Sequence, residues 1–276
     1  MTKEAPVNQW TNKNRRWLGI IAFCAFSACT PPINQDNSDT PELLIFAAAS
    51  LRDVITELGS MYEEKNKVRL IYNFAGSNVL AEQIAAAPKA DLYISANEKW
   101  MDTLEEKGAI DISSRRDFLS NRLVIIAHKN SPFKIEDPAQ LCTVPFTYLS
   151  IAHPQAVPAG HYARFWLERC FCEKTNVWEK VQDRLVPSPD VRAAMNLVEA
   201  NPQILGIVYK TDATSSKRVR VLYEVPDQES PDIRYSAAVL SHRPFMDKAN
   251  AFLEFLNSKI AKTVFEKQGF IPIIKN

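Results

Sequence analysis

The chain has 276 residues, of which 46% are hydrophobic and 24% are charged, and its formal net charge is +1. This length and composition suit two α/β lobes of ordinary size and exclude a largely disordered chain.

The first 28 residues have the pattern of a targeting segment. A basic cluster at residues 13–16 precedes an apolar stretch at residues 17–28, which is too short to span a bilayer stably. Residues 26–29, FSAC, resemble a bacterial lipobox, in which cleavage precedes a cysteine that is then acylated; Phe26 departs from the aliphatic residue preferred there. We therefore expect a lipid anchor on Cys29. Simple secretion, with cleavage near Ser27 or Ala28, and an uncleaved anchor are the alternatives.

Residues 29–42 are rich in proline, asparagine, aspartate and serine, and they predict a flexible tether between the membrane and the domain. Without residues 1–28 the chain keeps 29 basic and 31 acidic residues, a net charge of −2. These numbers imply no basic face, so we expect no nucleic-acid partner.

Three cysteines, Cys142, Cys170 and Cys172, lie beyond the targeting segment. An oxidising compartment permits a disulfide between Cys142 and either Cys170 or Cys172, and three free thiols are the equal alternative. We expect no metal-cation site, because the C-x-C pair has no second pair and the four histidines lack ligand spacing.

The fold is predicted to begin with an apolar strand at residues 43–46, followed by three small residues and Ser50. Ser50 suits an N-cap position, and Asp53 would complete a capping-box pattern. A serine at such a junction brings its hydroxyl and free helical N–H groups to one point. That point attracts an anion.

A second unit repeats this construction. Residues 68–73 alternate as a strand does, the segment FAGS ends in Ser77, and a helical pattern follows. A third strand at residues 90–96 and a helix at 98–107 complete a pattern that predicts a mainly parallel, doubly wound sheet. A surface loop is expected at residues 113–117. Ser50 and Ser77 each lie between a strand and the helix that follows it, so the two serines can meet at one edge of the sheet.

The second half offers three further candidate positions. A loop at residues 154–160 precedes a helix expected from His161, and its N–H groups near Ala159 and Gly160 can point at a ligand; a rigid turn without a ligand is the alternative. Asp190 is an expected N-cap, which places the Val191 N–H at a positive helix end. A strand at 204–209 ends in Tyr209, a residue that more often packs than binds. A strand at 234–241 and one helix within 247–267 follow.

Taken together, seven segments in order resemble the molybdate-binding proteins of bacterial molybdate ABC transporters. They are FAAASL (46–51), FAGS (74–77), ADLYISA (90–96), VPAG (157–160), DVR (190–192), GIVY (206–209) and the terminal segment 265–270. The resemblance covers residues 43 to about 274. It implies a class II periplasmic-binding-protein fold of two doubly wound α/β lobes with a ligand cleft between them, lobe 1 from residues 43–121 and 236–276 and lobe 2 from residues 122–235.

The resemblance also implies a function: an extracytoplasmic or periplasmic protein, expected to be a monomer, that binds molybdate or tungstate without a cofactor and delivers it to an ABC permease in the membrane. The oxyanion ligands fall on Ser50, Ser77, Ala159, Val191 and Tyr209. Hydroxyl groups of Ser50, Ser77 and Tyr209 would donate, as would backbone N–H groups of Ser50, Ser77, Ala159 and Val191.

Physical chemistry is consistent with this ligand class. A fully ionised tetrahedral dianion has only acceptors, so neutral donors suffice to bind it, and cavity size would separate the larger ions from sulfate. Binding of sulfate, thiosulfate or an organic acid is the nearer alternative. Catalysis through a serine nucleophile is disfavoured, because neither serine lies in G-x-S-x-G and no histidine is paired with a carboxylate in a motif.

Overall fold

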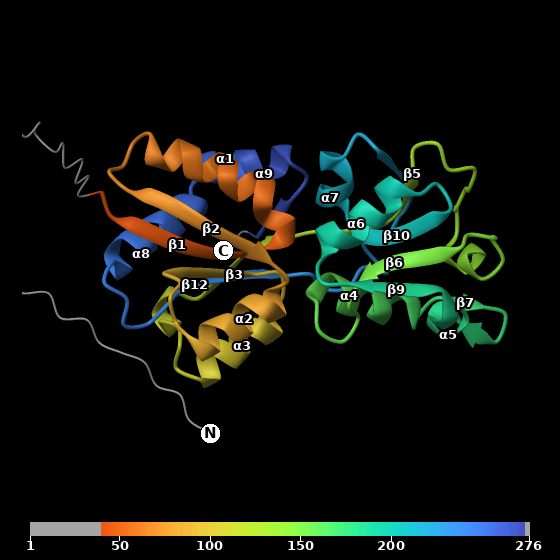
Figure 1. The fold of residues 1–276 in the computed structure, drawn as a ribbon, viewed down its shortest axis with the longest axis horizontal. Helices are drawn as coiled ribbons and strands as arrows, with labels where there is room; N and C mark the ends of the chain where they lie inside the picture. The colour runs from red at the N-terminus through yellow and green to blue at the C-terminus, as the bar shows by residue number, and fades with distance from the viewer. Residues whose placement is uncertain (1–39, 274–276) are drawn as a thin grey trace, which may run out of the picture. The chain divides into compact units, whose positions relative to one another are not determined.

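The computed structural model describes residues 40–273, which form two β-sheets flanked by helices (Figure 1). Residues 1–39, with the predicted targeting segment and Cys29, lie outside the described residues. No helix within residues 40–273 is both long enough and apolar enough to cross a membrane.

The first sheet has the strand order β13-β4-β12-β3-β1-β2. Its strands are β1 (Glu42–Ala48), β2 (Arg69–Ala75), β3 (Leu92–Ser95), β4 (Arg116–Ser120), β12 (Tyr235–Val239) and β13 (Ile271–Pro272). Strands β1, β2 and β3 run parallel, whereas β12 runs antiparallel to β3 and β4. The sheet is therefore mixed, and the prediction of a mainly parallel sheet is wrong: only β1, β2 and β3 run parallel, because β4, β12 and β13 pair antiparallel with their neighbours.

The second sheet has the order β11-β5-β10-β6-β9. Its strands are β5 (Leu123–His128), β6 (Tyr148–Ala152), β9 (Leu185–Ser188), β10 (Ile204–Tyr209) and β11 (Val219–Glu224). Strands β6, β9 and β10 are parallel, and β5 is antiparallel to β10 and β11. A small hairpin of β7 (Phe171–Cys172) and β8 (Thr175–Asn176) lies beside it.

Helices cover both faces of each sheet (Figure 1). On the first sheet they are α1 (Arg52–Glu63), α8 (Met246–Leu256) and α9 (Lys259–Lys267) on one face and α2 (Ser77–Ala86) and α3 (Glu98–Glu106) on the other. On the second sheet they are α6 (Val191–Ala200) and α7 (Lys210–Ser215) opposite α4 (Pro158–Leu167) and α5 (Val177–Val181).

Strand β1 shows how the apolar pattern makes this layering. Ile45 and Ala47 pack into the large core that contains α1, α8 and α9, whereas Phe46 packs into the smaller core of α2 and α3. Successive strand residues point to opposite faces, so a strand covered on both sides must be apolar throughout.

The predicted α/β fold is confirmed, with local corrections. The predicted loop at 113–117 is wrong in part, because β4 begins at Arg116, whose charge is paired with Glu254 at 2.7 Å. The single helix predicted at 247–267 is two helices, since Ser258 caps a new one by accepting from the Ala261 N–H.

Candidate functional site

Three parallel strands from each sheet end at one cavity. Residues that follow β1, β2 and β3 line it from the first sheet, and residues that follow β6, β9 and β10, or end them, line it from the second. The space between these walls, including the part that is open to solvent, is about 210 Å³. The structure brings all five predicted binding residues together here: the lining includes Ser50, Ser77, Ala159, Val191 and Tyr209.

Three of these residues lie in the first turn of a helix. Ser77 is the first residue of α2, Ala159 is the second of α4, and Val191 is the first of α6. Helix α4 begins at Pro158, not at His161 as predicted, so the Ala159 N–H belongs to a helix terminus rather than to a loop. First-turn N–H groups have no partner within their helix and carry partial positive charge. Three such ends at one cavity suit an anion.

The capping role predicted for Asp190 is confirmed. Its Oδ1 accepts a hydrogen bond from the Ala193 N–H at 2.9 Å. The carboxylate of Asp190 is thereby engaged with its own helix terminus, even though the residue also lines the cavity.

The capping role predicted for Ser50 and Asp53 is wrong. Ser50 lies in a short 3₁₀ turn, residues 49–51, that directly precedes α1. The N-cap residue of α1 is Leu51, which makes no side-chain cap. The Ser50 hydroxyl is instead 3.1 Å from the hydroxyl of Tyr235, and Asp53 pairs with Arg192. The extra turn moves Ser50 to the cavity wall.

The hydroxyl groups at the cavity are buried, and their partners differ. Ser77 Oγ accepts from the Ala96 N–H at 3.0 Å. The Tyr209 hydroxyl has no hydrogen-bond partner among the described residues, although the side chain is only 1% exposed. Burial raises the pKa of Tyr209 well above its ordinary value near 10, so its phenol keeps its proton. It is thus available as a donor.

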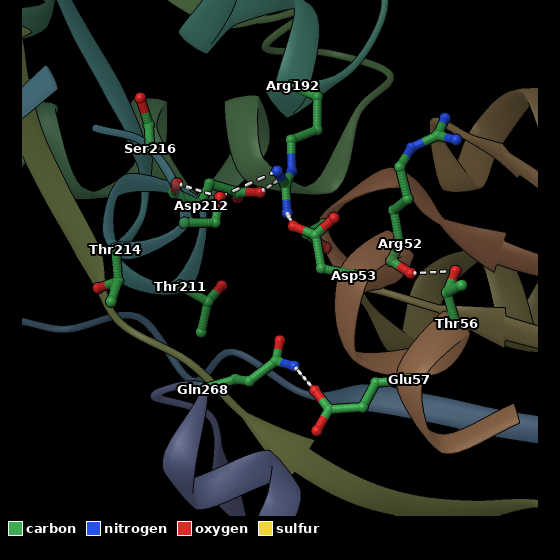
Figure 2. A network of polar contacts seen from close by, with 12 residues as sticks. Arg52, Asp53, Thr56, Glu57, Arg192, Thr211, Asp212, Thr214, Ser216 and Gln268 are labelled. Carbon is green, nitrogen blue, oxygen red and sulfur yellow. Dashed lines mark hydrogen bonds and ion pairs between the residues drawn. The ribbon is translucent and has the colours of Figure 1, made fainter. Parts of the chain in front are cut away.

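A charged cluster lies beside the cavity (Figure 2). Arg192, which follows Val191 on α6, places Nη2 2.6 Å from Asp53 Oδ2 and Nε 2.5 Å from Asp212 Oδ1. Asp212 is fully buried, and desolvation outweighs the attraction of Arg192 and raises the pKa of Asp212 to about 7. Sequence reasoning did not find this cluster, because no local pattern relates Arg192 to a carboxylate 139 positions away.

The walls of the cavity approach each other closely. The Trp100 Nε1–H on α3 donates to the Ala156 carbonyl beside α4 at 2.9 Å. A Cβ on Gly76 would lie 2.8 Å from the Pro189 carbonyl oxygen, closer than real Cβ atoms come to other heavy atoms. Glycine at position 76 therefore lets the turn after β2 meet the turn after β9.

The comparisons with known proteins fit this arrangement. The family model described as bacterial extracellular solute-binding protein matches residues 43–271. The chain is a bacterial extracellular solute-binding protein. This solute-binding protein is 35% identical over 261 residues to the molybdate-binding protein ModA of Escherichia coli (strain K12), covering 93% of this chain and 98% of the relative. It is 34% identical over 233 residues to ModA of Haemophilus influenzae, covering 83% and 89%.

Two further likenesses are more distant. The periplasmic molybdate-binding protein of Azotobacter vinelandii superposes with a TM-score of 0.74 at 17% identity, covering 85% of this solute-binding protein and 100% of that chain, which shows the shared fold. An aconitate isomerase of Pseudomonas sp. is 21% identical over 264 residues, covering 93% of this chain and 97% of that protein.

Proposed function

We propose that the protein captures molybdate or tungstate, as the fully deprotonated oxyanion, and delivers it to the permease of a molybdate ABC transporter. The observation that carries the proposal is one cavity lined by neutral donors from both sheets: hydroxyl groups of Ser50, Ser77 and Tyr209 and first-turn residues of three helices. Such donors bind an acceptor-only anion without a neutralising cation. The two ModA relatives supply the choice of anion.

A thermal-shift panel of molybdate, tungstate, sulfate, phosphate and thiosulfate tests the ligand. A ligand that binds only the folded state raises the melting temperature by mass action. We expect the largest shifts with molybdate and tungstate. A shift with sulfate equal to that with molybdate would contradict the proposal and favour a binding protein for another oxyanion.

Titration calorimetry on Ser50→Ala and Ser77→Ala tests the five-residue site. Each variant should lose about 1 to 3 kcal/mol of binding free energy, because a hydrogen bond to a charged ligand is lost. Unchanged molybdate binding by both variants would refute the assignment.

We also propose that residues 43–121 with 236–276, and residues 122–235, move as two lobes that close on the ligand. Each range contains one of the two sheets apart from Glu42, which begins β1, and Tyr235, which begins β12. The connections after β4 and before β12 are the natural hinges. Solution scattering should give a smaller radius with molybdate than without it; identical profiles would exclude closure.

We propose that the chain binds without catalysing a reaction, although one distant relative is an isomerase. Among the described residues, the side chain that hydrogen-bonds with the Ser50 hydroxyl is the phenol of Tyr235, not a histidine or a carboxylate that could act as a base. Incubation with cis-aconitate and trans-aconitate should leave both unchanged, and interconversion of the two would overturn this proposal.

Finally, we propose that a monomer is held at the outer face of the membrane by an acylated Cys29, which precedes the polar tether. Palmitate labelling in cells should disappear in Cys29→Ala. Labelling that survives the substitution would favour another anchor.

A further inference from the structure

A buried hydrogen-bond chain leads from the connections between the sheets to the cavity. The Asn121 amide Nδ2 donates to Thr211 Oγ1 at 2.9 Å and to the Tyr235 hydroxyl at 3.2 Å, and that hydroxyl lies 3.1 Å from Ser50 Oγ. All four side chains are at most 5% exposed. Asn121 follows β4 and Tyr235 begins β12, so each lies where the chain passes between the two sheets.

Asn121 determines which group donates and which accepts in each of these hydrogen bonds. The Arg122 backbone N–H donates to Asn121 Oδ1 at 2.8 Å. An N–H can only donate, so the amide atom beside it must be the oxygen, and the amide nitrogen must face Tyr235. The phenol oxygen of Tyr235 therefore accepts from Asn121.

The phenol proton of Tyr235 then has one acceptor within reach among its described contacts, which is Ser50 Oγ. A buried donor left without a partner is energetically costly, so this direction is favoured. Because Ser50 Oγ accepts from Tyr235, its own hydrogen is free for the cavity. The hydroxyl hydrogen of Ser77 is free for the cavity in the same way, since Ser77 Oγ accepts from the Ala96 N–H.

We propose that Tyr235, held by Asn121, is a positioning residue that fixes Ser50 as a hydrogen-bond donor and thereby favours unprotonated over protonated oxyanions. Hydrogen phosphate carries a proton that needs an acceptor, and the protein already donates to one of the two lone pairs on each serine oxygen, which makes these oxygens poorer acceptors. Neighbouring hydrogen bonds polarise one another, so Tyr235 also strengthens the bond that Ser50 donates. This inference rests on the proposed oxyanion-binding function and adds a residue outside the five that touch the anion.

The test is a double-mutant cycle with Ser50→Ala, Tyr235→Phe and both together, titrated with molybdate and with phosphate near neutral pH. Tyr235→Phe keeps the ring, which packs edge-on against Phe270. Alone it should weaken molybdate binding about three- to tenfold. In the Ser50→Ala background it should change binding less than about twofold, because its effect passes through Ser50.

The ratio of molybdate to phosphate affinity should also fall in Tyr235→Phe, since a freed Ser50 oxygen can accept the phosphate proton. A merely structural tyrosine would not change this ratio. Tyr72→Phe is the matched control, because the Tyr72 hydroxyl is also buried but has no hydrogen-bond partner among the described residues; it should alter neither affinity nor ratio.

Two results would overturn the inference: losses from Ser50→Ala and Tyr235→Phe that multiply in the double variant, or an unchanged ratio in Tyr235→Phe. Absence of oxyanion binding by the unaltered protein would instead refute the proposed function. If Tyr235→Phe does not fold, Asn121→Ala takes its place in the same cycle with the same expected pattern.

Discussion

Arg192 and Asp53 form an ion pair between the two sheets' helices: Arg192 belongs to α6, Asp53 belongs to α1, and their side chains meet at 2.6 Å (Figure 2). The pair lies directly beside the cavity, because Val191 precedes Arg192 and Ser50 precedes α1 by two positions. It can form only when the two walls are close together. The ion pair therefore favours the closed arrangement that we propose for the anion-bound protein.

Breaking this pair should speed ligand release. Asp53 is about half exposed, so the pair is expected to contribute only about 0.2 to 1 kcal/mol. Asp53→Asn should raise the dissociation rate of molybdate by about 1.4- to fivefold, measured by stopped-flow fluorescence, with little effect on association. Glu42→Gln, which removes an exposed pair with Arg69 inside the first sheet, is the control and should change neither rate. Equal rates in Asp53→Asn and the unaltered protein would show that the pair does not act on closure.

Asp212 should make stability depend on pH. Its pKa is about 7 in the folded protein, against an ordinary 3.8, so the folded state binds the proton more tightly than the unfolded state does. The groups that face it are Arg192, Asp53 and Asp190. Its contribution to the free energy of unfolding is therefore greatest below the ordinary pKa and decreases as the pH rises towards 7, by at most about 1.4 kcal/mol per pH unit.

Urea denaturation of the unaltered protein and of Asp212→Asn across this range measures the effect. The difference in unfolding free energy, unaltered minus variant, should fall with rising pH and level off above about pH 7. A difference that rises with pH would mean that Arg192, and not desolvation, dominates.

The substitution Tyr209→Phe should weaken molybdate binding without lowering the stability of the unliganded protein. Its hydroxyl makes no hydrogen bond among the described residues and is buried at the cavity, so Tyr209→Phe removes no protein–protein bond. The unliganded variant should be as stable as the unaltered protein or slightly more so, because a buried unpaired polar group is lost. Molybdate binding should weaken by about 1 to 3 kcal/mol. Calorimetry that gives equal affinities would remove Tyr209 from the site, and a marked loss of stability would show a structural role instead.

The sequence predicted the parts of the site that local chemistry defines. Ser77 follows a predicted strand and Tyr209 ends one, and parallel strands bring such ends together; Val191 was predicted from the helix that Asp190 caps. Asp190 was recognisable as a cap because the residue type and the following helical pattern suffice. Many residues lie at strand ends, and no single motif shows which of them bind a ligand. The resemblance to a family selected the five candidates.

What the sequence did not predict depends on contacts between distant residues. Ser50 looked like a helix cap, and only the fold places Tyr235 beside it, 185 positions away. The charged residues near Arg116 looked like a loop, because their partners, such as Glu254, belong to another element. The strand at 234–241 was predicted and is β12, whereas the antiparallel strands β4, β11 and β13 were not predicted, because their place in a sheet depends on distant strands and not on their own residue pattern.

The disulfide Cys142–Cys172 should stabilise the second sheet's side of the protein. Of the two pairings that the sequence left open, the structure contains this one, and Cys170 is free and buried. The two cysteines are 30 positions apart, and closing a loop of that size in the unfolded chain should contribute about 3 to 4 kcal/mol. Dithiothreitol should therefore lower the melting temperature of the unaltered protein and of Cys170→Ala alike, while the Cys142→Ala/Cys172→Ala double variant should melt lower and not respond. A reductant effect that persists in the double variant would place the stabilising bond elsewhere.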